Sequence, residues 1–437
     1  MSSQPFASFG LASLLVAVAC GTEPPAPGAV TITLDDVPAL TTTTGLIVTG
    51  HVARSPEVPD MPIVVSLTQG TTVATDTAAA EGTFRFGLTL TANQSTTLTI
   101  SATDASGSTS APVSAEVRHD GVPPGVVTLT PGDLADDVTP TLIQALFGEP
   151  IVPGTATIAL SHQRIPVPGA LALSVDSLTL SFTPTAALFG NAIYNVVVSG
   201  ARDVAGNTAG NSAACFVTGA AQATFADPTS DFFTAVTPPA NLVPIDLIGL
   251  RLRQTGDHLY GIVRFTTPRS FDVTSPSNTL IIVDLDVDSD GTTGFTTAKD
   301  TAFGAVLPNS GTKAEYGIWL LPQASPGDSS AVVQYTQPLG GTITQRIMPN
   351  TCGQAVSFMV ARSALGNDDG TFRTVLYSDT FFEEGGYADP GPDAGFYAAN
   401  LPTASATSAS AFTVAPLDRV NLRQWRPRID VLHPRPR

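Results

Sequence analysis

A run of alternating aspartates is the strongest chemical signal in the sequence. Asp284, Asp286, Asp288 and Asp290 occupy every second position, and Gly291 follows them. Four negative charges this close together repel one another strongly unless a cation neutralises them. Calcium suits such a run, because it is a hard ion with about six to eight oxygen ligands, and alternating carboxylates before a glycine turn can converge on one centre. The run therefore predicts a structural calcium site.

Additional ligands must come from elsewhere in the chain. The segment from Asp286 to Gly291 copies the first half of an EF-hand loop, but Thr297 stands where that loop carries its last glutamate. Asp300 and Glu315 are the candidates to complete the site. Two alternatives stay open: a solvated aspartate-rich turn without an ion, and a catalytic pair of carboxyl groups that exchange protons with a substrate.

The acidic run follows a segment that is typical of a β-strand. Residues 280–286 predict a strand with Asp284 and Asp286 on one face and Val283 and Leu285 on the other, because successive side chains of a strand point to opposite faces. The chain then enters a loop that carries the other two aspartates of the run. We therefore expect the site at the end of one strand.

Length and composition limit the kind of protein. The chain has 437 residues, which at about 150 residues per domain indicates roughly three domains. Its net charge is −17, which argues against a nucleic-acid partner. Hydrophobic residues make up 43% of the chain, whereas 38 glycines and 36 prolines interrupt it frequently. These values exclude disorder throughout and long coiled coils.

The pattern of the chain predicts an all-β protein, because short β-rich runs alternate with turn clusters and helical spacing is almost absent. We expect two Ig-like β-sandwiches followed by a larger, jelly-roll-like β-sandwich. The expected domains are residues 29–120, 121–219 and 220–416. In the last domain we expect strands at residues 246–250, 259–265, 280–286, 316–321, 331–336, 356–360 and 371–377.

The second domain carries the clearest family resemblance. Residues 178–184 (LTLSFTP), 194–200 (YNVVVSG) and 203–207 (DVAGN) resemble the closing half of bacterial Ig-like domains of the S-layer type. Residues 147–150 (FGEP) stand where that family has its Phe-Ser-Glu-Pro signature. The first domain shares only its ending, residues 102–107 (ATDASG). The resemblance implies spacer domains, and we assign these loops no catalytic role.

The third domain resembles DOMON-like and family-nine carbohydrate-binding modules. The resemblance rests on residues 246–265, 284–294, 314–318 and 389–393. In such modules an aspartate precedes the tyrosine at the place where this chain has Glu315 and Tyr316. The resemblance implies a sandwich that binds a glycan or another surface ligand without reacting with it.

Aromatic residues make up only 7% of the chain, so the few near the acidic loops are candidates for stacking on a sugar. Alternation places Tyr316 on one face of its strand and Trp319 on the other, and the alternative is that both belong to the core. Tyr387 and Phe396 flank an acidic loop. The candidate ligand-binding residues are therefore Tyr316, Trp319, Tyr387 and Phe396.

Motifs for catalysis are missing from the sequence. The five histidines are scattered without metal-ligand spacing, and no Gly-x-Ser-x-Gly elbow or phosphate-binding glycine loop occurs. We expect the protein not to be an enzyme. The alternatives to a binding protein are a structural or adhesive envelope protein without a small-molecule site, and a polysaccharide hydrolase that uses carboxylates of the last domain.

The N-terminus predicts export. Residues 10–19 form an apolar run that is too short for a membrane span of about twenty residues and is typical of a secretory signal. Residues 17–20 (AVAC) resemble the lipobox of bacterial lipoproteins, which implies a signal peptide at 1–20, lipidation of Cys20 and, because Gly21 follows, the outer membrane or cell surface. An ordinary cleaved signal is the alternative. Residues 21–28 are a proline-rich tether.

Two features remain near the end of the chain. Cys215 and Cys352 could pair in an oxidising compartment, but they fall in different expected domains, so we expect two buried free thiols. Residues 417–437 form a basic tail, which we interpret as a solvated segment. The alternative is that the tail contacts the protein's own acidic surface or anionic sugars of the outer membrane.

Overall fold

The computed structural model describes residues 30–54, 62–234, 242–272, 275–303, 307–322, 330–338, 340–366, 368–380, 387–392 and 395–401. These residues form strands β1 to β30, one short α-helix and one 3-10 helix, so the predicted all-β class is confirmed. The signal peptide with Cys20, the tether and the basic tail lie outside the described residues. Within the described ranges, no helix has both the length and the apolar character that a membrane crossing needs.

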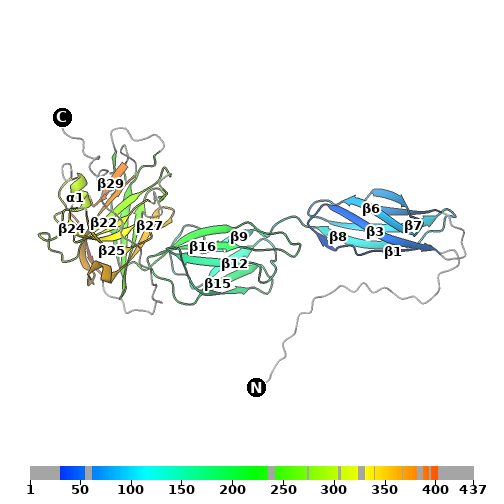
Figure 1. Cartoon of the computed structure of the whole chain (residues 1–437), viewed down its shortest axis with the longest axis horizontal. Helices are drawn as coiled ribbons and strands as arrows, with labels where there is room; N and C mark the ends of the chain where they lie inside the picture. The colour runs from blue at the N-terminus through cyan, green and yellow to red at the C-terminus, as the bar shows by residue number, and fades with distance from the viewer. Residues whose placement is uncertain are drawn as a thin grey trace, which may run out of the picture. The chain divides into compact units, whose positions relative to one another are not determined.

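The first sandwich has a three-stranded sheet, β1-β3-β6, and a five-stranded sheet, β2-β8-β7-β4-β5 (Figure 1). Its strands alternate inward and outward side chains; in β7, Leu98, Ile100 and Ala102 are fully buried and pack with Val48 of the facing sheet. This alternation is what a half-buried strand requires. The strands are β1 (Val30–Leu34), β2 (Leu40–Thr41), β3 (Gly45–Arg54), β4 (Ile63–Gln69), β5 (Thr72–Thr77), β6 (Thr83–Thr89), β7 (Ser95–Asp104) and β8 (Val113–His119).

The second sandwich pairs a five-stranded sheet, β10-β17-β16-β12-β13, with a four-stranded sheet, β14-β15-β11-β9. Tyr194 lies in its core, where its ring stacks on Phe216 with centroids 5.5 Å apart and its hydroxyl oxygen accepts the backbone N–H of Phe189 at 2.7 Å. The buried hydroxyl thus has a partner, as burial demands. The strands are β9 (Val126–Thr130), β10 (Ala135–Val138), β11 (Ile143–Phe147), β12 (Thr157–His162), β13 (Ile165–Pro166), β14 (Gly169–Leu173), β15 (Thr179–Pro184), β16 (Ile193–Ser199) and β17 (Ser212–Thr218).

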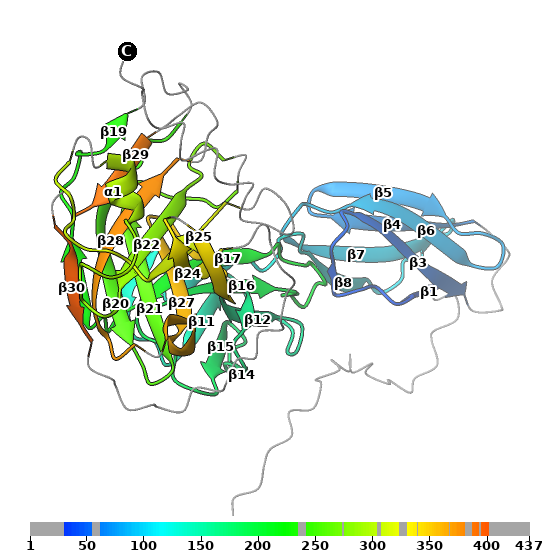
Figure 2. The same ribbon diagram turned by 60° about the vertical axis from the view of Figure 1, so that its left-hand side comes forward.

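The C-terminal sandwich has a five-stranded sheet, β18-β20-β21-β27-β26, and an eight-stranded sheet, β19-β29-β28-β22-β23-β24-β25 with β30 paired to β28. Its main core lies between the two sheets. A second apolar cluster covers the outer face of the larger sheet, where helix α1 (Ala298–Phe303) lies against β28 (Figure 2). That outer layer is the part of the fold that positions the acidic run.

The strands of the C-terminal sandwich follow most of the expected segments. The first group is β18 (Ala223–Ala226), β19 (Phe233–Thr234), β20 (Leu247–Gln254), β21 (His258–Phe265), β22 (Leu280–Asp286), β23 (Tyr316–Leu320) and β24 (Ala331–Gln337). The second group is β25 (Gly340–Arg346), β26 (Asn350–Cys352), β27 (Ala355–Ala361), the 3-10 helix η1 (Arg362–Leu365), β28 (Thr371–Asp379), β29 (Tyr387–Gly391) and β30 (Tyr397–Asn400).

The second sandwich and the C-terminal sandwich pack together as one compact unit. Cys215 of β17 forms a disulfide with Cys352 of β26, with their Cα atoms 5.6 Å apart. The expectation of two free thiols is therefore wrong. The cause is that the two sandwiches share an interface, so residues far apart in the sequence become neighbours.

Polar contacts reinforce this interface. The Asn191 side chain donates to the carbonyl oxygens of Arg251 and Tyr260 at 3.0 and 3.2 Å. Arg251 forms an ion pair with Asp137 at 2.7 Å, and its guanidinium is mostly buried. The Asp137 side chain is largely exposed, so the buried Asn191 hydrogen bonds are the contacts that hold the two domains in one orientation best.

Candidate metal centre

Both aspartates that begin the acidic run lie on the outer face of β22. Val283 and Leu285 point into the core between the sheets, and Asp284 and Asp286 point to the opposite face. The two carboxylates are only 2% and 1% exposed. A buried carboxylate needs hydrogen-bond donors or a counterion, because its transfer from water is costly.

Asp286, Asp288 and Glu315 form one group, which we call the β22 cluster. One side-chain oxygen of each residue lies within 4.8 Å of the others. Calcium binds oxygen at about 2.3–2.6 Å, so a single ion can bridge oxygens that are about this far apart. The backbone N–H of Val287 donates to Glu315 Oε2 at 2.9 Å and fixes this carboxylate beside the other two.

A glycine makes room for Glu315 in the loop. Gly294 has φ of 72°, and a Cβ atom placed on it would lie 2.3 Å from Glu315 Oε1. Any other residue would combine an unfavourable backbone conformation with this clash. The loop that follows the acidic run can therefore close over the cluster only with glycine at this position.

Asp286 has one oxygen that is satisfied and one that is not. Its Oδ2 accepts a hydrogen bond from the Thr312 hydroxyl and lies 3.7 Å from Arg373 Nη1. Its Oδ1 is buried, and none of the described residues donates a hydrogen bond to it. Burial raises the pKa of Asp286, and the Thr312 hydroxyl and Arg373 oppose this shift. A cation at the β22 cluster would satisfy the open oxygen.

The other two members differ in their surroundings. Asp288 is exposed, and the N–H of Asp290 and the Thr293 hydroxyl, at 2.8 Å each, lower its pKa. Glu315 is half-buried, and burial together with the charges of the two aspartates raises its pKa. One exposed and two partly or fully buried carboxylates form a site that is open on one side.

The remaining three predicted ligands lie elsewhere, which corrects the expectation of six. The Asp284 carboxylate accepts the Tyr335 hydroxyl and the backbone N–H of Ala298, each at 2.5 Å, and burial raises its pKa to about 7. Asp290 accepts the N–H and the hydroxyl of Thr292, at 2.9 and 2.7 Å, inside its own turn.

Asp300 is also occupied by local donors. It lies in α1 and accepts both the N–H of Ser310, at 2.8 Å, and the Ser310 hydroxyl, at 2.5 Å. Nothing in the sequence pattern near Asp300 indicates Ser310 as its partner. Asp284, Asp290 and Asp300 therefore stabilise the loop layer instead of joining the β22 cluster.

The three predicted aromatic residues whose side chains are described do not form one surface. Trp319 is 5% exposed, and its indole N–H donates to the Tyr335 hydroxyl at 3.0 Å, so it is a core residue and the prediction of a sugar platform is wrong for it. Phe396 is partly buried under the Arg373 guanidinium, 4.7 Å from the ring centre. The side chain of Tyr387 lies outside the described part of the structure.

Tyr316 is also buried, at 7% exposure, and packs in the main core, but unlike Trp319 it lines a pocket beside the β22 cluster. The pocket has a volume of about 640 Å³, and Asp288 and Glu315 lie on its wall. Gln334, Asp368 and the end of η1 also line it. Sequence reasoning missed these residues, because β24 and the loop after η1 reach this place only through strand pairing. Its polar lining residues are Asp288, Ser289, Glu315, Gln334, Asp368, Asp369 and Thr371.

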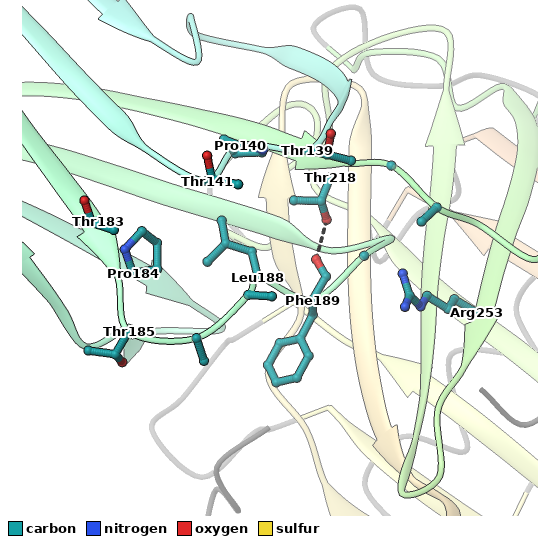
Figure 3. A pocket seen from close by; sticks show the side chains of 15 residues that line it. Thr139, Pro140, Thr141, Thr183, Pro184, Thr185, Leu188, Phe189, Thr218 and Arg253 are labelled. Carbon is teal, nitrogen blue, oxygen red and sulfur yellow. Dashed lines mark hydrogen bonds between the residues drawn. The ribbon is translucent and has the colours of Figure 1, made fainter. Parts of the chain in front are cut away.

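A second pocket lies where the second sandwich meets the C-terminal sandwich (Figure 3). It has a volume of about 490 Å³, and Arg253 is the one charged residue among those that line it. The Thr218 hydroxyl donates to the carbonyl oxygen of Phe189 at 2.7 Å and holds one wall in place. The other lining residues are threonines, prolines and small or apolar residues, so this pocket offers few groups for specific recognition.

The family comparisons support the domain types at the start of the chain. Residues 120–218 match the family described as bacterial Ig-like domain, and residues 26–119 match the family described as bacterial Ig domain. The expected pair of Ig-like sandwiches is thus confirmed. Both matches end before the C-terminal sandwich. No curated protein matches the sequence.

Solved structures are similar to this chain only at low sequence identity and low TM-score. A structure concerning host cell surface retention of a 1.5-MDa bacterial ice-binding adhesin is 12% identical, covers 87% of this chain and 100% of its own, and has a TM-score of 0.28. PcoC, a methionine-rich copper resistance protein from Escherichia coli, is 17% identical, covers 22% and 99%, and has a TM-score of 0.21. At such scores these structures say nothing about the function of this chain. The part of the chain that a family describes is therefore its two bacterial Ig-like domains.

Proposed function

We propose that the protein is an exported, lipid-anchored cell-surface protein whose Ig-like domains act as spacers for a C-terminal sandwich that binds calcium and a glycan. The observation that carries this proposal is the β22 cluster, in which Asp286 Oδ1 is buried without a donor from the described residues and faces two further carboxylates. We propose no catalytic step for this site.

Calcium is the cation that fits the β22 cluster best. All three side chains offer oxygen, and hard oxygen ligands favour calcium or magnesium over zinc or copper. The mixture of an exposed and two less exposed carboxylates leaves coordination positions for water or for a ligand hydroxyl. Arg373 and Thr312 hold the second oxygen of Asp286, which fixes the direction of the first.

A glycan is the ligand that the neighbouring pocket favours. Sugars are recognised by planar polar side chains together with an aromatic ring, and the pocket has Gln334, Asp368 and Asp369 next to Tyr316. Asp288 and Glu315 of the β22 cluster line the same pocket, so a bound calcium ion would be within reach of sugar hydroxyls. The resemblance to DOMON-like and family-nine carbohydrate-binding modules supports the same ligand class.

Export and surface location rest on separate observations. Disulfides persist in oxidising compartments, and Cys215 pairs with Cys352. Bacterial Ig-like domains are suited to hold another domain away from a surface. We propose that Cys20 carries the lipid anchor at the outer membrane and that the membrane is contacted through this anchor alone. Cys20→Ser should release the protein from membranes, and an unchanged membrane fraction would contradict the anchor.

A structural or adhesive envelope protein without a small-molecule site is the second candidate. It is favoured by the burial of Trp319, which removes one of the expected sugar-stacking residues. In this case calcium would stabilise the sandwich, but the pocket beside Tyr316 would hold only water. The two candidates differ in one measurable property, the retention of a sugar in the presence of calcium.

A glycan array with the full chain tests the proposal. We expect retained glycans with calcium present, and loss of that retention in EDTA and in Asp288→Asn. Asp288 is exposed, so its substitution should leave the fold intact. Asp257→Asn is the matched control, because Asp257 is an exposed aspartate of the same sandwich outside the β22 cluster and its pocket.

The outcomes separate the candidates. Calcium binding without any retained glycan would favour the structural candidate, and the absence of calcium binding at the β22 cluster would refute the proposal. Turnover of a polysaccharide that Asp286→Ala abolishes without unfolding the protein would instead indicate a hydrolase.

A further inference from the structure

A second group of carboxylates lies at another edge of the C-terminal sandwich. Asp227, Asp231 and Asp389 each place one oxygen within 4.8 Å of the others, and we call them the β29 cluster. Asp389 belongs to β29, and the other two lie between β18 and β19. The order of strands in the larger sheet separates β29 from β22 by β28, so this group is distinct from the β22 cluster.

The surroundings of the Asp389 carboxylate favour a positively charged group beside it. Its side chain is 0% exposed, and its Oδ2 accepts the backbone N–H of Leu247. Its Oδ1 is buried, and no described residue donates a hydrogen bond to it. A buried carboxylate oxygen beside two other carboxylates is strongly unfavourable unless a cation or a proton lies between them.

The neighbouring groups keep the β29 cluster in place. The Tyr397 hydroxyl donates to Asp227 Oδ1 at 2.8 Å. Asp246 stays close by, where its Oδ1 accepts the N–H of Ser230 at 2.8 Å, and its charge acts on Asp389. The site is therefore built from oxygen atoms that local hydrogen bonds already orient.

We propose that Asp227, Asp231 and Asp389 bind a second divalent cation of the calcium type, which joins the two sheets of the C-terminal sandwich at this edge. The ligands are hard oxygens without histidine or cysteine, which favours calcium over transition metals. Their spacing agrees with calcium–oxygen distances of about 2.3–2.6 Å. The proposal does not depend on the glycan function or on the β22 cluster.

The topology explains what such an ion would do. Asp227 directly follows β18, which belongs to the five-stranded sheet, whereas Asp389 lies in β29 of the eight-stranded sheet. Asp231 lies two residues before β19, the edge strand of the larger sheet. An ion held by all three would connect both sheets through the segment that crosses between them.

Calcium titration of the full chain, followed by calorimetry and metal analysis, tests the proposal. We expect the wild-type chain to bind two ions. Asp389→Asn and Asp231→Asn should each bind only one ion with the wild-type affinity. Their affinity for the second ion should fall at least about tenfold, which corresponds to about 1.4 kcal/mol. Asp231 is only partly buried, so its variant keeps the test valid if Asp389→Asn does not fold. Asp257→Asn, the control, should still bind two.

Terbium provides a readout that is local to the β29 cluster. Tyrosine sensitises terbium emission only at short range, and Tyr397 contacts Asp227. In the Asp288→Asn background, where the β22 cluster is disabled, excitation of tyrosine should give terbium emission. Tyr397→Phe in that background should remove most of this emission while the chain still binds one calcium ion.

The results distinguish this inference from the proposed function. Two ions bound by both Asp389→Asn and Asp231→Asn, with wild-type affinities, would overturn the β29 site. A single wild-type ion that Asp288→Asn abolishes would also overturn it and leave the proposed function standing. A single wild-type ion that Asp288→Asn retains and Asp389→Asn loses would support the β29 site and refute calcium at the β22 cluster.

Discussion

Asp284 and Asp286 lie two residues apart on the same face of the same strand, yet their surroundings differ. Two protein donors occupy the Asp284 carboxylate, the Tyr335 hydroxyl and the Ala298 N–H. Asp286 has Thr312 and Arg373 on one oxygen and no donor from the described residues on the other. Two aspartates that are equally buried can therefore have different roles. The hydrogen-bond donors around each carboxylate decide which one is a structural group and which one is a candidate metal ligand.

A small residue makes the Asp284 arrangement possible. Gly317 lies opposite Asp284 in the register of β22 and β23. A Cβ atom on Gly317 would lie 2.1 Å from the Tyr335 hydroxyl oxygen, so only glycine leaves room for this hydroxyl to reach the carboxylate. Among the residues that the structure describes, none donates a hydrogen bond to Asp286 Oδ1.

The largest expected effect is on the fully paired aspartate. Asp284→Ala leaves the Tyr335 hydroxyl and the Ala298 N–H buried without a partner, and each such loss costs about 1–3 kcal/mol. We expect the free energy of unfolding to fall by about 3 kcal/mol, equally with calcium and with EDTA. Denaturant unfolding of the full chain measures this. Asp284→Asn keeps an acceptor oxygen and should lose much less; equal losses in both variants would contradict the pairing argument.

Unlike the effect of Asp284→Ala, the effect of Asp286→Asn on the free energy of unfolding should depend on calcium. An ion at the β22 cluster should add about 2.7 kcal/mol to the stability of the wild-type chain when free calcium exceeds the dissociation constant of this site about a hundredfold. The variant should lose this gain and keep only the stabilisation that an ion at the β29 cluster provides. Thermal unfolding with and without calcium checks the prediction, and it requires the full chain, because the C-terminal sandwich shares an interface and a disulfide with its neighbour. A variant that remains fully stabilised by calcium would show that Asp286 is not a ligand.

Asp379 also has one carboxylate oxygen with a donor and one without, and its contribution to stability should depend on pH. Its Oδ2 accepts the Tyr377 hydroxyl at 3.1 Å, its Oδ1 has no donor among the described residues, and burial raises its pKa from 3.8 to about 7. Because the folded state favours the neutral acid, Asp379 lowers stability progressively as the pH rises from about 4 to about 7.

Asp379→Asn should therefore stabilise the protein at pH 7.5 and leave it unchanged at pH 4. The expected size is at most about 1.4 kcal/mol for each unit by which the pKa is raised. Unfolding curves in EDTA across this range measure it, since EDTA removes any contribution from bound ions. A variant that is less stable than the wild type at pH 7.5 would show that the charged form is well accommodated.

The smallest effects separate the core aromatic residue from the pocket residue. Trp319→Phe removes one hydrogen bond to Tyr335, so we expect a loss of about 1 kcal/mol in stability and no change in glycan retention. Tyr316→Phe keeps the ring but removes the hydroxyl of a residue that lines the pocket, so it should change stability by less than this but weaken glycan retention. The reverse pattern would place the ligand on the Trp319 side of the sheet.

Local sequence patterns predicted the strand of the site well. Residues 280–286 form β22 as expected, and alternation placed Asp284 and Asp286 on one face. Glu315 was proposed as a ligand because the modules that this sequence resembles carry an aspartate before a tyrosine at that place. These features depend on neighbours in the sequence, which is why sequence reasoning could reach them.

Contacts between distant segments were beyond such reasoning. Arg373 reaches Asp286 because β28 pairs with β22, and Asp389 meets Asp227 because β29 lies near the end of β18. The helix α1, which brings Ala298 to Asp284, is too short to leave a periodic signal. The Cys215–Cys352 disulfide likewise depends on an interface that neither domain's own sequence pattern encodes.

The disulfide also decides how tension would travel through the chain. A pull applied to the chain on both sides of these two sandwiches enters the second sandwich at β9, leaves it through β17 and can pass directly from Cys215 to Cys352, without loading the peptide between them. That bypassed stretch includes β22, β23 and the loop of the β22 cluster. Under such a pull along the backbone, the strands that carry the β22 cluster stay mechanically unstrained, because the covalent shortcut carries the force.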